Sequence, residues 1–238
     1  MKLLICFALM VYCGGAFAQR TAGVPTHSIG TFNTPSLTGG NDAFTYGRGI
    51  DLSNSKYSDV AGSPFLKQDF TNAFLAFRNG KKYSNVPVKF DILNNEIDID
   101  EKQTLISLQE IDSISFPDSI YQIMILKTGY PSINKHDENS IYQIVAQNNK
   151  IQLLKYYHCH ISTVRTLGLP DKSTFDVDDQ YYLYNKATKV IVDVKLNKKS
   201  ISSAIADLGY SKAEIDKDKN IDFKNEKDVA TLIGTAIL

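Results

Sequence analysis

The segment His158-Cys159-His160 has the residue types and spacing that most clearly permit chemistry in this sequence. Side chains alternate between the two faces of a β-strand, so on a strand His158 and His160 would share one face and Cys159 would take the other. Two imidazoles on one face could bind a transition metal, with a distant carboxylate or His136 completing the ligand set. A nucleophilic thiol needs its base within hydrogen-bond reach, which the same alternation prevents. We therefore treat His158 and His160 as candidate metal ligands. The alternative is two strand histidines beside a buried cysteine.

Residues 216–222 place oxygen-bearing side chains at positions 1, 3, 5 and 7, the spacing of a calcium-binding loop. Ile221 replaces the glycine that the turn of such a loop needs at position 6. Lys227, a cation, stands at position 12, where a glutamate should coordinate the ion. We interpret this segment as a solvated, charged turn at the end of a helix.

An acidic stripe follows from the alternation of Glu96, Asp98 and Asp100 with Ile97 and Ile99. The stripe could bind a cation or a basic partner, and paired carboxylates also serve hydrolases. Carboxylates on the solvated face of a hairpin more simply discourage edge pairing. We expect the acidic side to face water and the isoleucines to pack.

Tyrosines at positions 156, 157, 181, 182 and 184 could line a groove for a carbohydrate or a peptide, because tyrosine offers a flat apolar face and a hydroxyl. Alternation puts Tyr182 and Tyr184 on one face and Tyr181 on the other, which favours cross-strand packing instead. The chain has no tryptophan, which weakens the carbohydrate interpretation. No serine lies in a Gly-x-Ser-x-Gly elbow, and we expect no cofactor.

The elements that must position these residues are short strands. After residue 62, β-branched and aromatic residues occur in short runs separated by Asn, Gly, Asp and Pro, which predicts an antiparallel meander. Asn79-Gly80 predicts a two-residue hairpin turn, because both residues tolerate a positive φ. The predicted strands are 73–78, 83–92, 96–100, 104–108, 112–116, 120–127, 140–147, 151–158, 180–184 and 189–194.

The last forty residues have a helical period. One apolar stripe ends at Gly209, a typical helix stop, and a second follows Asn225, a typical helix start. Isolated helices of this length are marginal in water, so both must dock. The two stripes comprise Ile201, Ala204, Ile205 and Leu208, and then Val229, Leu232, Ile233 and Ile237.

The N-terminus is typical of an export signal. Lys2 precedes an apolar run over residues 3–12, and Ala16-Phe17-Ala18 offers small residues at a cleavage site. We expect cleavage after Ala18 and an exported, periplasmic or extracellular, mature chain without a transmembrane segment. Lipidation at Cys13 is the alternative, although Tyr12 stands where a small residue is expected.

The organisation follows from these segments: a signal peptide at 1–18, an irregular lead-in at 19–60, an antiparallel β domain at 61–196 and a helical appendage at 197–238. The fold class is mainly β with an α appendage, a meander that is curled or barrel-like.

Basic and acidic residues number 26 each, so no overall positive charge attracts nucleic acid.

Gly62-Ser63-Pro64-Phe65-Leu66 and Asn85-Val86-Pro87 carry motifs that resemble those of a family of secreted or periplasmic β-rich proteins of Bacteroidetes-type bacteria. The shared pattern is a Ser-Pro-aromatic-Leu start, a Gly-containing turn, an Asn-Val-Pro strand, an acidic hairpin and a closing capped helix. The resemblance implies an exported β-rich protein and implies no substrate or catalytic residue. The matching segments are 62–66, 69–70, 79–80, 83–97 and 219–229.

We expect an exported, non-catalytic envelope protein that acts as an interaction or scaffold module with an envelope protein as partner. One alternative is a metal-dependent exported hydrolase using His158 and His160. Another is a carrier of a small molecule or lipid inside a closed β-barrel.

Overall fold

A computed structural model describes residues 57, 60–99, 104–120, 122–165, 171–211 and 221–235. The chain divides into two units, Met1–Phe32 and Asn33–Leu238, and all described residues belong to the second unit. The predicted signal peptide, nearly all of the predicted lead-in and positions 216–220 of the calcium-like segment lie outside the described residues.

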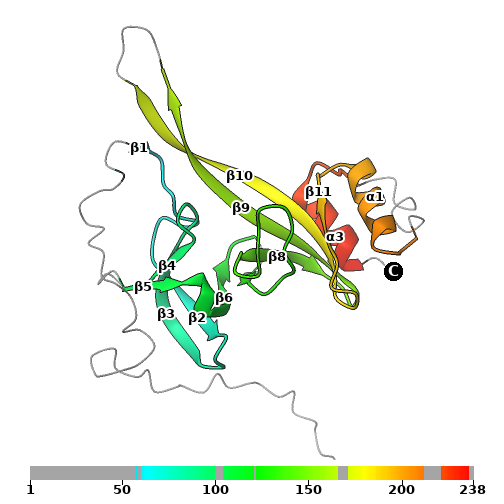
Figure 1. The fold of residues 1–238 in the computed structure, drawn as a ribbon, viewed down its shortest axis with the longest axis horizontal. Coiled ribbons are helices and arrows are strands. Elements are labelled where there is room, and N and C mark those ends of the chain that lie inside the picture. The colour runs from blue at the N-terminus through cyan, green and yellow to red at the C-terminus, as the bar shows by residue number, and fades with distance from the viewer. Residues whose placement is uncertain are drawn as a thin grey trace, which may run out of the picture. The chain divides into compact units, whose positions relative to one another are not determined.

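Eleven described strands form one sheet, in the order β1-β10-β9-β8-β7-β6-β2-β3-β4-β5, with β11 also pairing with β10 (Figure 1). All these pairs are antiparallel except β1 with β10, which are parallel. The strands are β1 (Val60–Ala61), β2 (Thr71–Phe77), β3 (Lys82–Asp91), β4 (Glu96–Ile99), β5 (Thr104–Ser107), β6 (Ile111–Asp118), β7 (Gln122–Lys127), β8 (Tyr142–Gln147), β9 (Ile151–Val164), β10 (Lys172–Asn185) and β11 (Ile191–Val194).

The predicted fold class, mainly β with a short α appendage, is confirmed. Each of the ten predicted strands has a counterpart, and among the described strands only the two-residue β1 was not predicted. Within the described residues the strand path is not closed, because β1 and β5 at its two ends do not pair.

The predicted turn at Asn79-Gly80 forms a hairpin, but its geometry differs from the prediction. Only Gly80 has a positive φ, at 85°, and its amide donates to the carbonyl of Phe77 at 2.9 Å. Strand β3 does not start until Lys82, so the connection is longer than two residues. The side chain of Asn79 instead accepts a bond from the amide of Lys81, which stabilises the turn without a second left-handed residue.

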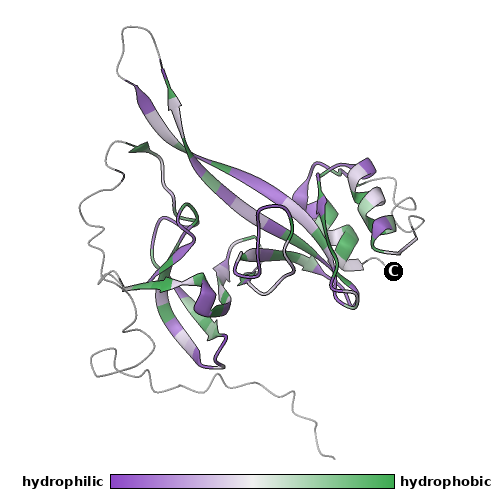
Figure 2. Ribbon diagram, in the orientation of Figure 1, coloured by the Kyte–Doolittle hydropathy of each residue, from purple (hydrophilic) through white to green (hydrophobic). Residues whose placement is uncertain are grey.

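The hairpin of β9 and β10 is longer than predicted. The predicted counterparts of β9 and β10 are residues 151–158 and 180–184, whereas the two strands pair over fourteen positions from Ile151↔Asn185 to Val164↔Lys172. Polar colours dominate β10 in Figure 2, and in its first half only Phe175 and Val177 alternate with polar residues, too short a pattern to mark a strand of this length. Cross-strand pairing, which is non-local, supplies the missing stabilisation. Hydroxyl pairs such as Ser162–Thr174 at 3.1 Å contribute to it.

Most buried apolar residues lie in two clusters. The main core collects residues of β2–β7 together with Cys159 of β9. The second core lies between the sheet and the two described helices, α1 (Lys198–Asp207) and α3 (Glu226–Thr235). The second core contains side chains of both helices and of the sheet, so apolar packing holds the helices on the sheet.

The helical stripes are buried as predicted, except that Ile237 lies outside the described residues. Asn197 caps α1 by accepting a bond from the amide of Ser200, and Gly209 ends the helix with a φ of 84°. The described members of both stripes belong to the second core, where α3 packs on β8 and β9 and α1 packs on β11. Neither described helix has the length and apolar character required to cross a membrane.

Candidate functional site

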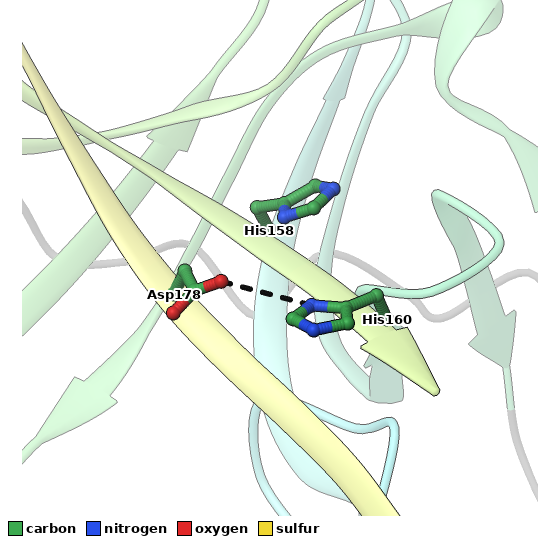
Figure 3. Close-up of side chains that lie close together, drawn as sticks. All are labelled: His158, His160 and Asp178. Atoms are coloured by element: carbon green, nitrogen blue, oxygen red, sulfur yellow. Dashed lines mark ion pairs between the residues drawn. The ribbon is translucent and has the colours of Figure 1, made fainter. Parts of the chain in front are cut away.

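His158, His160 and Asp178 lie together on one face of the β9–β10 hairpin (Figure 3). Their potential ligand atoms all lie within 4.8 Å of one another. Nδ1 of His160 is 3.6 Å from Oδ2 of Asp178, and the two imidazole rings stack with centroids 5.5 Å apart. Two nitrogen donors and one carboxylate therefore converge, which is a ligand set typical of a transition-metal site.

The strand register explains this cluster. Asp178 pairs directly with His158, and Asp176 pairs with His160, so the two histidines and both aspartates share one face. The prediction that the two histidines share a face is confirmed, whereas Asp178 was not predicted to lie beside them. The spacing in Asp176-Val177-Asp178 is the only local signal, and it has meaning only once residues 172–179 are known to be a strand.

His136, the other suggested ligand, lies elsewhere. Its ring centroid is 4.0 Å from that of Tyr156, and its Nε2 is 3.2 Å from Oε1 of Gln180. It belongs to the packing around a tyrosine cluster rather than to the histidine pair. Of the two ways proposed to complete the metal site, the structure favours the distant carboxylate.

The cluster is open to solvent. His158 and Asp178 are exposed and His160 is half-buried. Nδ1 of His160 is nevertheless removed from water and has no hydrogen-bond partner among the described residues. An open surface of this kind is accessible to an ion, whereas a substrate is normally bound in a concave pocket.

Cys159 points to the opposite face and is buried in the main core. Burial raises the pKa of its thiol, and the carboxylates of Asp91 and Asp176 raise it further. Because the thiolate is the reactive form, this cysteine is a poor nucleophile at neutral pH.

A tyrosine cluster continues along the histidine face toward the other end of the hairpin. Burial raises the pKa of Tyr182 to about 12, with a further contribution from Asp193. Burial also raises the pKa values of Tyr130, Tyr142 and Tyr156. These rings pack against one another, as the cross-strand interpretation predicted. The cluster contains Tyr130, Tyr142, Leu154, Tyr156, Tyr182, Tyr184 and Ile191.

A charged network connects the opposite face of the hairpin to α3. Nζ of Lys155 lies 2.8 Å from Asp179 and 3.0 Å from Glu226, and the hydroxyl of Tyr181 donates to Glu226 at 2.5 Å. The lysine is paired with two carboxylates, one of them on α3, so the network serves to position α3 on the sheet.

The prediction that the acidic stripe of β4 faces water is wrong. Asp98 is only 7% exposed and Glu96 is half-buried, and Asp100 lies outside the described residues. Strand β4 lies between β3 and β5, so its backbone is paired on both edges, and the face carrying Asp98 is covered. The predicted solvated face is therefore not a surface for a cation or a basic partner.

The chain matches no protein-family model, no curated protein and no solved structure. The resemblance to secreted proteins of Bacteroidetes-type bacteria therefore stays a prediction. Function must be argued from the geometry of this chain.

Proposed function

We propose that this protein is an exported, non-catalytic interaction module of the cell envelope. It binds its partner through the outer part of the long hairpin, residues 158–164 of β9 and 172–178 of β10, here called the hairpin arm. The partner is a protein that contributes an extended segment.

The edge of β9 is the observation that carries this proposal. Strand β9 pairs with β10 along its whole length but with β8 only at positions 152–155. From His158 onward, its second edge has no partner strand among those described. Such an edge presents backbone N–H and C=O groups, and an extended peptide can hydrogen-bond to them as an additional strand of the sheet.

Apolar side chains of the arm support the same interaction. Ile161, Val164 and Val177 are 43%, 59% and 46% exposed. Backbone pairing at an edge gives affinity, and side-chain contacts at alternate positions give specificity. An added strand would cover part of this apolar surface.

The two alternatives have less support. A hydrolase would need a concave site that holds its substrate beside the reacting water, whereas His158 and Asp178 are exposed. A carrier would need a closed barrel with a lumen, whereas the described strand path is open and its inner face is filled by the main core.

Site-specific photo-crosslinking in the native envelope tests the proposal. A photoreactive residue replaces exposed Thr163 in the arm or, as a control, exposed Lys82 at the start of β3. We expect one protein to be crosslinked from position 163 and not from position 82. Equal crosslinking from both positions, or none from 163 in the exported, folded protein, would contradict the proposal.

A pair of matched variants then tests the arm with the identified partner. Ile161→Lys places a charge in the arm, and Val190→Lys places one at a residue that is equally exposed, 43% against 44%. Because a lysine on an edge strand opposes strand addition, we expect only Ile161→Lys to weaken binding, by about tenfold or more.

A further inference from the structure

We propose that His158, His160 and Asp178 bind one late first-row divalent metal ion, of which Zn²⁺ is the representative. This inference goes beyond the proposed function and does not depend on it, because it concerns an ion and not a partner protein.

The backbone already holds the three ligands at suitable positions. His158 and Asp178 are cross-strand partners, and His160 is two residues along the same face. Zinc binds imidazole nitrogen and carboxylate oxygen at about 2.0–2.2 Å, so its ligands lie about 3.3–3.5 Å apart in a tetrahedron. The present separations of up to 4.8 Å must shrink by up to about 1.5 Å. The exposed side chains of His158 and Asp178 can achieve this by rotation without moving the strands.

The state of His160 is the second argument. Its Nδ1 is desolvated and faces Oδ2 of Asp178 at 3.6 Å, which is too long for a hydrogen bond. Buried polar atoms normally have a hydrogen-bond or ligand partner, so we infer that this nitrogen binds one in the functional protein. A cation between His160 and Asp178 would supply a ligand bond to both atoms.

The donor set selects the class of metal. Two imidazoles favour zinc, copper, nickel or iron, whereas calcium and magnesium prefer oxygen ligands only. Asp178 contributes one negative charge, and Asp176, opposite His160, adds a second nearby. Three protein ligands leave one position of a tetrahedral ion open to water or to another ligand.

Isothermal titration of the full mature chain, without an affinity tag and after removal of metal by a chelator, tests this site. We expect one Zn²⁺ per chain and no binding of Mg²⁺ or Ca²⁺. His158→Ala and His160→Ala should each weaken Zn²⁺ binding by at least about 100-fold, because loss even of an outer-shell partner costs 10- to 100-fold. Asp171→Asn, an exposed aspartate of the same hairpin, is the matched control and should change nothing.

Two further measurements test whether the metal is bound by His158 and His160 and not elsewhere in the chain. Cobalt(II) in place of zinc should give the visible absorption of a four-coordinate site, and this absorption should vanish in the double variant His158→Ala, His160→Ala. Cys159→Ala should leave both signals unchanged, because the thiol lies on the other face. Absence of zinc binding by the wild-type chain, or equal binding by a folded double variant, would overturn the proposal.

Discussion

The hydroxyl groups of Tyr142 and Tyr130 have different environments within the same tyrosine cluster. The hydroxyl of Tyr130 donates to Oε1 of Gln152 at 3.1 Å in a buried position. The hydroxyl of Tyr142 is buried and has no hydrogen-bond partner within the described residues. A buried hydroxyl that lacks a partner has lost its water without compensation, so the two tyrosines contribute differently to stability.

We therefore expect Tyr142→Phe to leave the free energy of unfolding unchanged or to raise it by up to about 1 kcal/mol. Tyr130→Phe removes a buried hydrogen bond and leaves Gln152 without that donor, so it should lower the same quantity by about 1–2 kcal/mol. Urea denaturation at pH 7 measures both variants. A similar loss in the two would show that Tyr142 has a partner in the folded chain.

The tyrosine cluster also predicts how stability depends on pH. An unperturbed tyrosine releases its proton at about pH 10, whereas burial raises the pKa of Tyr182 in the folded chain to about 12. Between these values the folded state holds a proton that the unfolded state has lost, so stability falls as the pH rises. Below pH 10 this contribution is fully present.

We expect the urea midpoint of the wild-type chain to fall steadily above about pH 10. Tyr182→Phe removes one titrating group, so its midpoint should fall less steeply over the same range. Denaturation series at pH 9, 10 and 11 measure the slopes. Identical slopes would mean that Tyr182 is not protected from titration in the folded state.

Helix α3 depends on packing against the sheet. Val229, Leu232 and Ile233 are buried in the second core. The side-chain amide of Asn148 donates to the carbonyl of Ile233 at 2.9 Å, and Lys155 of β9 pairs with Glu226 at the start of the helix. A ten-residue helix gains most of its stability from such contacts and little from its own backbone.

Leu232→Ala should lower the free energy of unfolding by about 2–4 kcal/mol, because it leaves a cavity in the second core. Lys227→Ala, on the exposed side of the same helix, should cost less than about 0.5 kcal/mol. Chemical denaturation compares them. Equally small losses would indicate that α3 is not held on the sheet in solution and would make its apolar stripe a second binding surface.

The start of the described part is attached to the long hairpin across a large distance in sequence. Val60 and Ala61 of β1 pair in parallel with Ser173 and Thr174. The ring of Tyr57 packs edge-on against Phe175 with centroids 5.2 Å apart, and its hydroxyl accepts a bond from Asn94 at 2.6 Å. These contacts join the N-terminal side of the β region to both the hairpin and the turn between β3 and β4.

A shortened chain that begins at Ala61 loses the contacts of Tyr57 and Val60, whereas one that begins at position 56 keeps both residues. We expect the shorter chain to melt about 4–8 °C below the full mature chain, which corresponds to about 2 kcal/mol in a protein of this size. The longer chain should melt close to the full chain. Calorimetry measures the thermal midpoints. Equal midpoints for both shortened chains would mean that Tyr57 and Val60 contribute nothing measurable to stability.

Export is predicted from residues outside the described part. Lys2, the apolar run and Ala16-Phe17-Ala18 together predict cleavage after Ala18. Mass spectrometry of the protein purified from its native envelope should find a first residue Gln19, with or without cyclisation of that glutamine. An intact Met1 would exclude a cleaved signal peptide and would remove the basis for placing the partner in the envelope.

Local features were predictable from the sequence because their causes are local. Short runs of β-branched and aromatic residues predicted a counterpart of each strand from β2 to β11, although only the second half of β10, and Gly209 predicted the end of α1, where it has a positive φ. The pairing of His158 and His160 on one face also needs only the two-residue period of a strand. Turn chemistry and periodicity act over a few residues, so they can be identified without knowing the fold.

Tertiary structure alone decided which residues meet across strands. The mostly polar segment 172–179 becomes a strand because β9 lies beside it, and only that register brings Asp178 to the two histidines. Asp98 is buried rather than exposed because neighbouring strands and their side chains cover it. The pairing of β1 with β10 likewise joins residues more than one hundred positions apart. Such contacts depend on the free energy of the whole packed chain, which no short sequence pattern contains.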